Sequence, residues 1–283
     1  MPGAKAALHP NSNRKDKTMA TNYKPYVLEF DLKPDTGLDV VGDIHGCMDE
    51  LLDLMRAAGY LVSQLPSTRE FHISHPEGRT LILVGDIVDR GPRNLDALRF
   101  LRSLMISGVG TAVIGNHDYK ALRAMHGRNV VVANGLDLTL AELQMADPSE
   151  VADLRDALGA MPTQILIRRP GSQEILIVHG SAPERHQLLQ KKNSFERSIY
   201  GYAGEAHNGI LERLDWAQDY SGSRMVIHGH EPTPQRRFVN NVHNIDTGCV
   251  YGGIMTMFRV YEGQFLEQPA RQVYHPRIDF ASN

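Results

Sequence analysis

The sequence has little cysteine, little excess charge and no long apolar run. Cys47 and Cys249 are the only cysteines among 283 residues, which excludes a disulfide framework and fits reduced thiols. The formal net charge of −3 argues against a basic surface that neutralises many nucleic-acid phosphates. No run reaches the roughly 20 apolar residues of a membrane helix, and the first residues lack the apolar stretch of a secretory signal. We therefore expect a cytoplasmic protein that binds neither nucleic acid nor a membrane.

The apolar content is sufficient for one large domain. Hydrophobic residues make up 42% of the chain, which is enough to bury a sizeable core. The first residues are polar and basic, so we expect residues 1–36 to form a flexible N-terminal arm. The domain itself is expected over residues 37–262, and residues 263–283 are expected to form a C-terminal surface tail.

The first half of this domain repeats one pattern three times. An apolar run, a polar loop with glycine and a helical pattern follow one another in "LDVVGDIHG", "TLILVGDIVDRGP" and "GTAVIGNHD" with their downstream segments. In the first unit Met48, Leu51 and Met55 recur at helical spacing, and Gly59 is placed to end the helix. Strand, loop and helix in succession predict an α/β fold.

The second half is richer in strands. Asp147 and Pro148 in "DPSE" predict a helix start with a capping side chain and proline at the first helical position. "TQILIRR" and "EILIVHG" flank a turn and predict a hairpin. A further hairpin is expected in "FHISHPEGRTLILVG", with its turn between His75 and Gly78.

Polar side chains follow almost every apolar run. They are Asp43, His45, Asp86, Asp89, Arg90, Asn116, His117, Asp118, His179, His228, His230 and Asp246. Ligands gather at the carboxyl ends of strands in α/β folds, so these groups can converge from distant positions. Carboxylate, imidazole and amide oxygen suit divalent manganese, iron or zinc. Each fragment alone fits a turn or a packed histidine, but five of them at strand exits predict a dinuclear metal site.

Five of these motifs together resemble one protein family. GDIHG, GDIVDRG, GNHD, the histidine of "VHGS" and that of "HGHEP" resemble the calcineurin-like metallophosphoesterases, in their phosphoprotein-phosphatase branch. "GNHDYKALRAMHGRNV" and "NIDTGCVYGG" are similar to bacterial bis(nucleosyl)-tetraphosphatases of the PrpE and ApaH types and to the Pnkp phosphatase domain. The resemblance covers about residues 38–260. It implies a four-layer sandwich of two mixed β-sheets flanked by helices.

The resemblance also implies the ligands of two divalent metal ions, with manganese expected first and iron or zinc as alternatives. The ligands implied for the first ion are Asp43, His45 and Asp86. Those implied for the second ion, with Asp86 bridging, are Asp86, Asn116, His179 and His230. Asp246 is expected behind these residues, where it steers a ligand or water. His228 is expected to be structural.

The catalytic roles follow from the same resemblance. A hydroxide that bridges the two metals would attack phosphorus directly, without a phosphoenzyme. His117 would protonate the leaving oxygen, and Asp89 would orient its ring. Arg90 has the fork geometry to hold phosphate oxygens, and Asn116 would contact the substrate beside it.

Three functions stay open at this point. The first is a metal-dependent phosphatase for phosphoprotein Ser, Thr or Tyr or for small phosphomonoesters. The alternative is a dinucleoside polyphosphate hydrolase such as one acting on diadenosine tetraphosphate. That enzyme needs a platform for bases, and Tyr119, Tyr200, Tyr202 and Trp216 are candidates. Arg123 and Arg213 could reach substrate, but we expect them on a solvated helix face and in a surface loop. The third, a silent scaffold, predicts missing ligands, yet every expected ligand is present.

Overall fold

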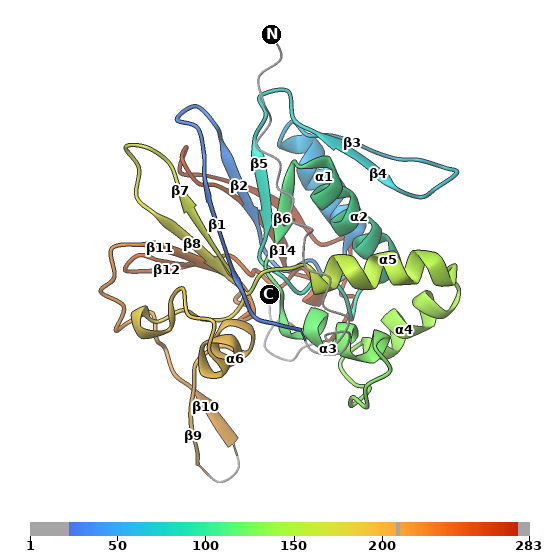
Figure 1. Ribbon diagram of the computed structural model, residues 1–283. Helices are drawn as coiled ribbons and strands as arrows, with labels where there is room; N and C mark the ends of the chain where they lie inside the picture. Colours follow the sequence, from blue (N-terminus) through green and yellow to red (C-terminus); the bar gives the residue numbers. More distant parts are fainter. Residues whose placement is uncertain (1–22, 208–209, 277–283) are drawn as a thin grey trace.

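The computed structural model describes residues 23–207 and 210–276, and its centre is a pair of mixed β-sheets (Figure 1). The five-stranded sheet contains, in spatial order, β15 (Gln264–Pro269), β14 (Ile254–Arg259), β2 (Leu38–Val41), β5 (Thr80–Leu83) and β6 (Gly110–Ala112). The six-stranded sheet contains β1 (Val27–Asp31), β7 (Gln164–Arg168), β8 (Ile175–Val178), β11 (Met225–His228), β13 (Val242–Asn244) and β12 (Arg237–Val239).

Two antiparallel ribbons and a set of helices complete the described residues. The ribbons are β3 (Leu61–Gln64) with β4 (Phe71–Ser74), and β9 (Ala203–His207) with β10 (Ile210–Arg213). The α-helices are α1 (Met48–Ala57), α2 (Asn94–Ser107), α3 (Asn116–Met125), α4 (Leu136–Gln144), α5 (Pro148–Gly159) and α6 (Lys192–Tyr200). Two short 3₁₀ helices are η1 (Glu184–His186) and η2 (Cys249–Tyr251).

The core lies between the two sheets and on both of their outer faces. Val40 and Ile82 of one sheet share an apolar cluster with Ile177 of the other. Helices α1 and α2 cover the outer face of the five-stranded sheet (Figure 1). Trp216 and Tyr220 cover the outer face of the other. Strands covered on both faces are apolar along their whole length, as the sequence pattern indicates. The predicted sandwich of two mixed sheets flanked by helices is confirmed.

The local helix signals are also confirmed. Helix α1 buries Met48, Leu51 and Met55, and Gly59 follows it with a φ of +89°. Helix α5 begins at Pro148, and the side chain of Asp147 accepts a hydrogen bond from the backbone N–H of Ser149. These elements depend on residues a few positions apart, which is why the sequence alone predicts them.

The prediction of a hairpin with its turn between His75 and Gly78 is wrong. Strand β4 pairs with β3, whereas β5 lies between β2 and β6 and is parallel to both. The apolar run of β5 is buried on both faces in the middle of a sheet, so its partners come from the repeated strand-loop-helix units. Adjacency in the sequence was therefore a poor guide to pairing here.

The expected domain boundaries are also wrong on both sides. Residues 27–31, placed in the arm, form β1, which pairs in parallel with β7. Residues 264–269, placed in the tail, form β15, which pairs with β14. Both are edge strands that bury only part of their side chains, so they carry too weak an apolar signal to stand out. Residues 1–22 of the expected arm and 277–283 of the expected tail lie outside the described residues.

The topology determines where the loops meet. Strands β2, β5 and β6 are mutually parallel, and so are β8, β11 and β13. The loops after these strands therefore leave each sheet at one end. Among the described residues no helix is long and apolar enough to cross a membrane.

Candidate metal centre and active site

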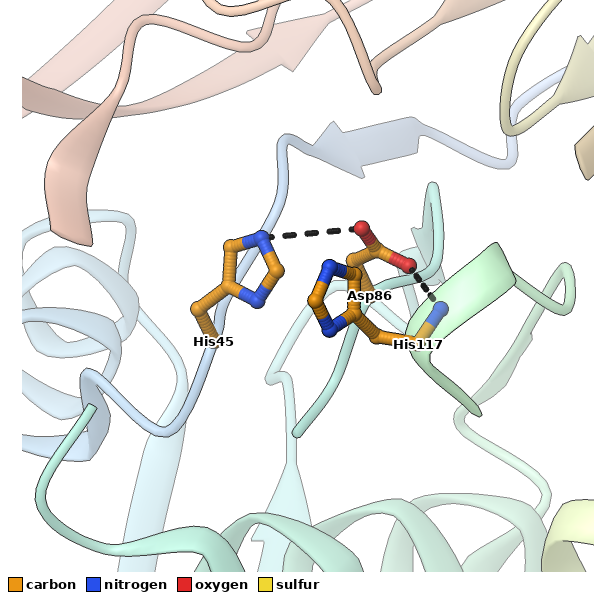
Figure 2. Close-up of side chains that lie close together, drawn as sticks. All are labelled: His45, Asp86 and His117. Carbon is orange, nitrogen blue, oxygen red and sulfur yellow. Dashed lines mark hydrogen bonds and ion pairs between the residues drawn. The ribbon is translucent and has the colours of Figure 1, made fainter. Parts of the chain in front are cut away.

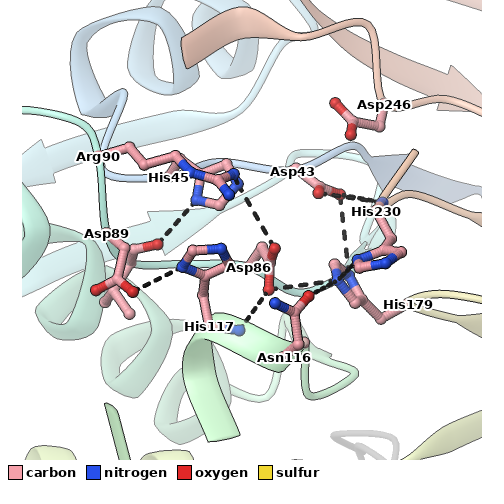
Figure 3. Close-up of polar contacts among 12 residues, drawn as sticks. Asp43, His45, Asp86, Asp89, Arg90, Asn116, His117, His179, His230 and Asp246 are labelled. Atoms are coloured by element: carbon pink, nitrogen blue, oxygen red, sulfur yellow. Dashed lines mark hydrogen bonds and ion pairs between the residues drawn. The ribbon is translucent and has the colours of Figure 1, made fainter. Parts of the chain in front are cut away.

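The predicted donors gather at the carboxyl ends of the central strands (Figure 3). The five-stranded sheet supplies Asp43 and His45 after β2, Asp86 after β5, and Asn116 after β6. The six-stranded sheet supplies His179 after β8, His230 after β11, and Asp246 after β13. Positions up to about two hundred residues apart therefore meet where the two sheets end side by side.

One group of donors surrounds the buried ring of His179. Its Nε2 lies 3.3 Å from Asp86 Oδ1, 3.1 Å from Asn116 Oδ1 and 3.2 Å from His230 Nδ1. Ligands that each lie about 2.0–2.2 Å from one ion are separated from one another by about 3.0–3.4 Å. The spacing and the nitrogen and oxygen chemistry of these four atoms therefore fit a single divalent ion.

A second group of donors lies on the other side of Asp86. His45 Nε2 is 3.5 Å from Asp86 Oδ2. One ring nitrogen of His117 lies within 4.8 Å of a donor atom of His45 and of a donor atom of Asp86 (Figure 2). The carboxylate of Asp43 lies beside the first group, where it accepts the backbone N–H of His230 at 3.1 Å. Asp86 thus presents one oxygen to each group, as a carboxylate shared by two ions does.

Backbone carbonyls orient two of the imidazoles. The Nδ1 of His45 bonds to the carbonyl oxygen of Val88, and that of His179 bonds to the carbonyl of Val84, both at 2.9 Å. A carbonyl only accepts, so Nδ1 carries the proton and Nε2 presents its lone pair to the cluster. Such outer hydrogen bonds are typical of histidines that bind metal.

The carboxylates of the site are buried and face one another. Burial, together with Asp246 and Asp86, holds the pKa of Asp43 well above its usual range. Burial also raises the pKa of Asp246 to about 6, against the opposing bond from Gly248 N–H. For Asp86 burial acts in the same direction, but His179, His117 and His45 outweigh it and keep the pKa well below its usual range. Adjacent buried acids of this kind are stabilised by cations.

The loops of the site adopt a costly backbone conformation. Five of its side chains stand on residues with φ in the left-handed region, namely His45 (45°), Asp86 (47°), Asp89 (75°), Arg90 (71°) and His230 (68°). Each such residue costs on the order of 1–3 kcal/mol and requires support from its surroundings. Two close approaches also require glycine, because a Cβ would lie 2.2 Å from Asp86 Oδ1 at Gly115 and 1.9 Å from Asp43 Oδ1 at Gly229.

His117 and Asp89 form a buried pair beside the metal donors. His117 Nδ1 lies 2.6 Å from Asp89 Oδ2, and the hydroxyl of Thr139 donates to the other Asp89 oxygen at 2.6 Å. Asp89 therefore fixes the ring, and Nε2 remains for a reacting group. Arg90 donates to His45 Nε2 at 2.8 Å, and its guanidinium lies 5.4 Å from the centre of the Tyr251 ring.

Two residues to which the sequence analysis gave no role support the site, namely Asp118, which it placed after a strand, and Thr139, which it missed. Asp118 is fully buried and accepts the backbone N–H groups of Ile87 and Gly115, so it ties the GDIVDRG loop to the GNHD loop. Burial, with Asp86 nearby, raises its pKa to about 7. An acid at the third position of α3 was a usable capping signal. Thr139 lies 50 positions after Asp89, and no local pattern could have identified it.

Two residues weighed in the sequence analysis lie outside the site, namely His228, which was expected to be structural, and Trp216, which was a candidate platform for a base. His228 is buried, bonds to the carbonyl of Gly229 and lies 5.5 Å from the Trp216 ring, and burial lowers its pKa to about 4. Trp216 packs under the six-stranded sheet, so it offers no platform for a base.

Two stacked mixed sheets, with nitrogen and oxygen donors in the loops between their ends, define the class of metallophosphoesterases. The chain belongs to the calcineurin-like phosphoesterase family, which it matches over residues 38–247.

Curated relatives and solved structures refine this placement. The chain is 34% identical over 240 residues to the bis(5'-nucleosyl)-tetraphosphatase PrpE of Halalkalibacterium halodurans, an alignment that covers 83% of this chain and 94% of the relative. It is 35% identical over 243 residues to PrpE of a Geobacillus strain, covering 84% and 96%. A crystal structure described as a candidate diadenosine tetraphosphatase has a TM-score of 0.63 and 25% identity, covering 87% and 98%. A protein serine/threonine phosphatase of Saccharomyces cerevisiae shares the fold, with a TM-score of 0.55 and 16% identity over 90% and 86%.

Proposed function

We propose that this protein hydrolyses dinucleoside polyphosphates at a dinuclear divalent-metal site, with manganese as the ion. Asp43, His45 and Asp86 would hold one ion, and Asp86, Asn116, His179 and His230 would hold the other. The observation that carries the proposal is the set of four donor atoms around His179, whose separations suit one divalent ion.

A pocket beside these donors supports a polyphosphate substrate. It has a volume of about 390 Å³, and Asn116, His117, Lys120, Arg123 and Tyr200 belong to its lining. Arg123 is exposed, with its guanidinium 5.8 Å from the centre of the Tyr119 ring, and half of Tyr200 is exposed. Cationic groups suit a chain of phosphates, and an exposed aromatic ring suits a stacked base.

The side chains divide the chemistry among themselves. Bound metal ions would supply an activated water and neutralise charge on the phosphate oxygens. His117, held by Asp89, would give the proton of Nε2 to the oxygen of the departing nucleotide. Arg90, already placed beside His45, would hold the oxygens that gain charge during the reaction.

The relatives favour the second of the three functions left open by the sequence. The two curated relatives named above are bis(5'-nucleosyl)-tetraphosphatases, whereas the similarity to the yeast protein phosphatase extends to the fold alone. We therefore give the dinucleotide substrate precedence over phosphoprotein.

A substrate panel tests the proposal. The protein, stripped by a chelator and reloaded with manganese, is offered diadenosine tetraphosphate, phosphoserine and phosphotyrosine peptides, and an aryl phosphate. We expect kcat/KM to be at least about tenfold higher for the dinucleotide, because only this substrate engages Arg123 and Tyr200 as well as the metals. A higher kcat/KM for any phosphopeptide would refute the proposed substrate class.

Matched variants test whether Arg123 and Tyr200 determine the preference for the dinucleotide substrate. Arg123→Ala and Tyr200→Ala should each raise KM for the dinucleotide about three- to tenfold and leave the aryl phosphate nearly unchanged. Arg56→Ala, which removes an exposed cation on α1 outside the pocket, is the control. Equal effects on both substrates would place the determinant elsewhere.

A further inference from the structure

A second group of metal-type donors lies beside the active site and has no part in the proposed reaction. Cys47, Glu50 and Cys249 are at most 2% exposed, and one donor atom from each lies within 4.8 Å of the others. Cys47 directly precedes α1, Glu50 lies in its first turn, and Cys249 begins η2. The group therefore joins segments that are two hundred residues apart.

Glu50 is the unusual member of this group. One of its oxygens, Oε1, accepts the backbone N–H of Arg271 at 2.9 Å and the hydroxyl of Tyr274 at 2.7 Å. The other, Oε2, is buried and has no hydrogen-bond partner in the described part of the chain. A carboxylate oxygen in that position is costly unless a proton or a cation satisfies it.

The chemistry of the group differs from that of the active site. Two sulfurs and a carboxylate are donors that select zinc among the common divalent ions, whereas the active-site donors are nitrogen and oxygen only. The carbonyl oxygen of His45 lies 3.7 Å from Cys47 Sγ and accepts the hydrogen bond of its thiol. The group is closed to solvent, as structural zinc sites are.

We propose that Cys47, Glu50 and Cys249 bind one structural zinc ion, distinct from the two ions of the active site. On binding, each thiol forms a sulfur–zinc bond and releases one proton to solvent, and the carboxylate coordinates without releasing a proton. The ion would tie the loop that carries Asp43 and His45 to the loop that carries Asp246. Both active-site loops would thereby be held against α1.

Cobalt substitution tests the site with a signal that the active site cannot give. The full chain is stripped by a chelator under reducing conditions and titrated with Co²⁺, and near-ultraviolet absorption is recorded. We expect a sulfur-to-cobalt charge-transfer band that saturates at one ion per chain, because thiolates occur only in this group. Zinc should abolish the band by displacement.

Variants confirm the ligands. Cys47→Ser and Cys249→Ser should each weaken or remove the band, and Glu50→Gln should lower cobalt affinity about 10- to 100-fold. Asp86→Asn, which alters only the active-site donors, should retain the band. The wild-type titration stands even where a variant fails to fold. Folded wild-type protein that shows two titratable thiols but no charge-transfer band overturns the proposal and leaves the cysteines as packing residues. A disulfide between them overturns it as well.

Discussion

Strand β2 connects two buried aspartates with opposite roles. Asp39, near the start of the strand, receives Arg79 Nε and Nη2 at 2.8 and 2.6 Å and the Tyr60 hydroxyl at 2.8 Å. Glu262 completes this group through two further bonds to Arg79. Asp43, just beyond the other end of the strand, faces Asp86 and Asp246 instead.

The difference lies in what compensates the charge. The Asp39 group contains the guanidinium of Arg79, and the hydrogen bonds that it donates to Asp39 and Glu262 raise its pKa further, so the group is complete without a ligand. The Asp43 group has carboxylates in excess, so it is completed by cations from solution. Two equally buried aspartates therefore have different roles, because Asp39 stabilises the fold with Arg79 whereas Asp43 belongs to a group that suits cations.

Removing the shared carboxylate should have the largest effect. Asp86→Asn should lower kcat/KM at least about 1,000-fold, since a neutral amide compensates two dications poorly and several kcal/mol of charge stabilisation is lost. The free energy of unfolding of the metal-free protein should also fall, because His179, His117 and His45 stabilise the charged form of Asp86 there. Steady-state kinetics with manganese and chemical denaturation measure the two effects. Activity within tenfold of wild type would contradict the assigned role.

The same test at the other end of β2 should change stability and leave the chemistry of the folded protein intact. Arg79→Ala leaves Asp39 buried without its partner, and we expect the free energy of unfolding to fall by about 3–5 kcal/mol. The activity per folded molecule should stay within about threefold of wild type. Urea denaturation and kinetics below the transition check this, and Arg79→Lys is the milder control. Loss of activity without loss of stability would show that the two groups are coupled.

The pH dependence of the metal-free protein should sharpen the contrast. The pKa values of Asp246, about 6, and Asp118, about 7, lie above those of the unfolded chain. The folded state therefore binds more protons than the unfolded state between about pH 4 and 7, and stability should decline as pH rises through that window. Manganese should suppress the decline. Denaturant midpoints between pH 4 and 8, with and without manganese, measure it, and identical profiles would argue against the cation-dependent group.

The smallest effect is expected from Tyr60. Tyr60→Phe removes one hydrogen bond to Asp39 but leaves both bonds from Arg79, so the free energy of unfolding should fall by only about 1–2 kcal/mol. Urea denaturation measures the change. A loss as large as that of Arg79→Ala would mean that the guanidinium alone does not compensate Asp39.

Much of the fold could be predicted because its signals are local. The helical spacing in α1, the Asp147 cap of α5 and the hairpin of β7 and β8 each depend on a few neighbouring residues. The pairing of β5 and the edge strands β1 and β15 could not be predicted in the same way. A strand at a sheet edge buries few side chains, and its partner can lie anywhere in the chain.

The same division holds for the site. Motifs after strands identified the donors, and the structure places Asp43, Asp86, Asn116, His179 and His230 together. Asp118 was named without a role and Thr139 was missed, because both residues hold other site residues in place. Cys47 and Cys249 each follow motif residues closely, so the sequence predicted packing positions near the site for both, but nothing in it indicated a group with Glu50.

The sequence by itself determined the α/β class, the order of the donors along the chain and their nitrogen and oxygen chemistry, because these depend on residue type and on spacing over a few positions. Only the tertiary structure decided which donors lie close enough to share an ion, why Asp39 is structural while Asp43 lies among the metal-type donors, and which residues support the loops. The physical reason is that the free energy of a buried charge depends on its neighbours in space, and distant segments of the chain supply those neighbours.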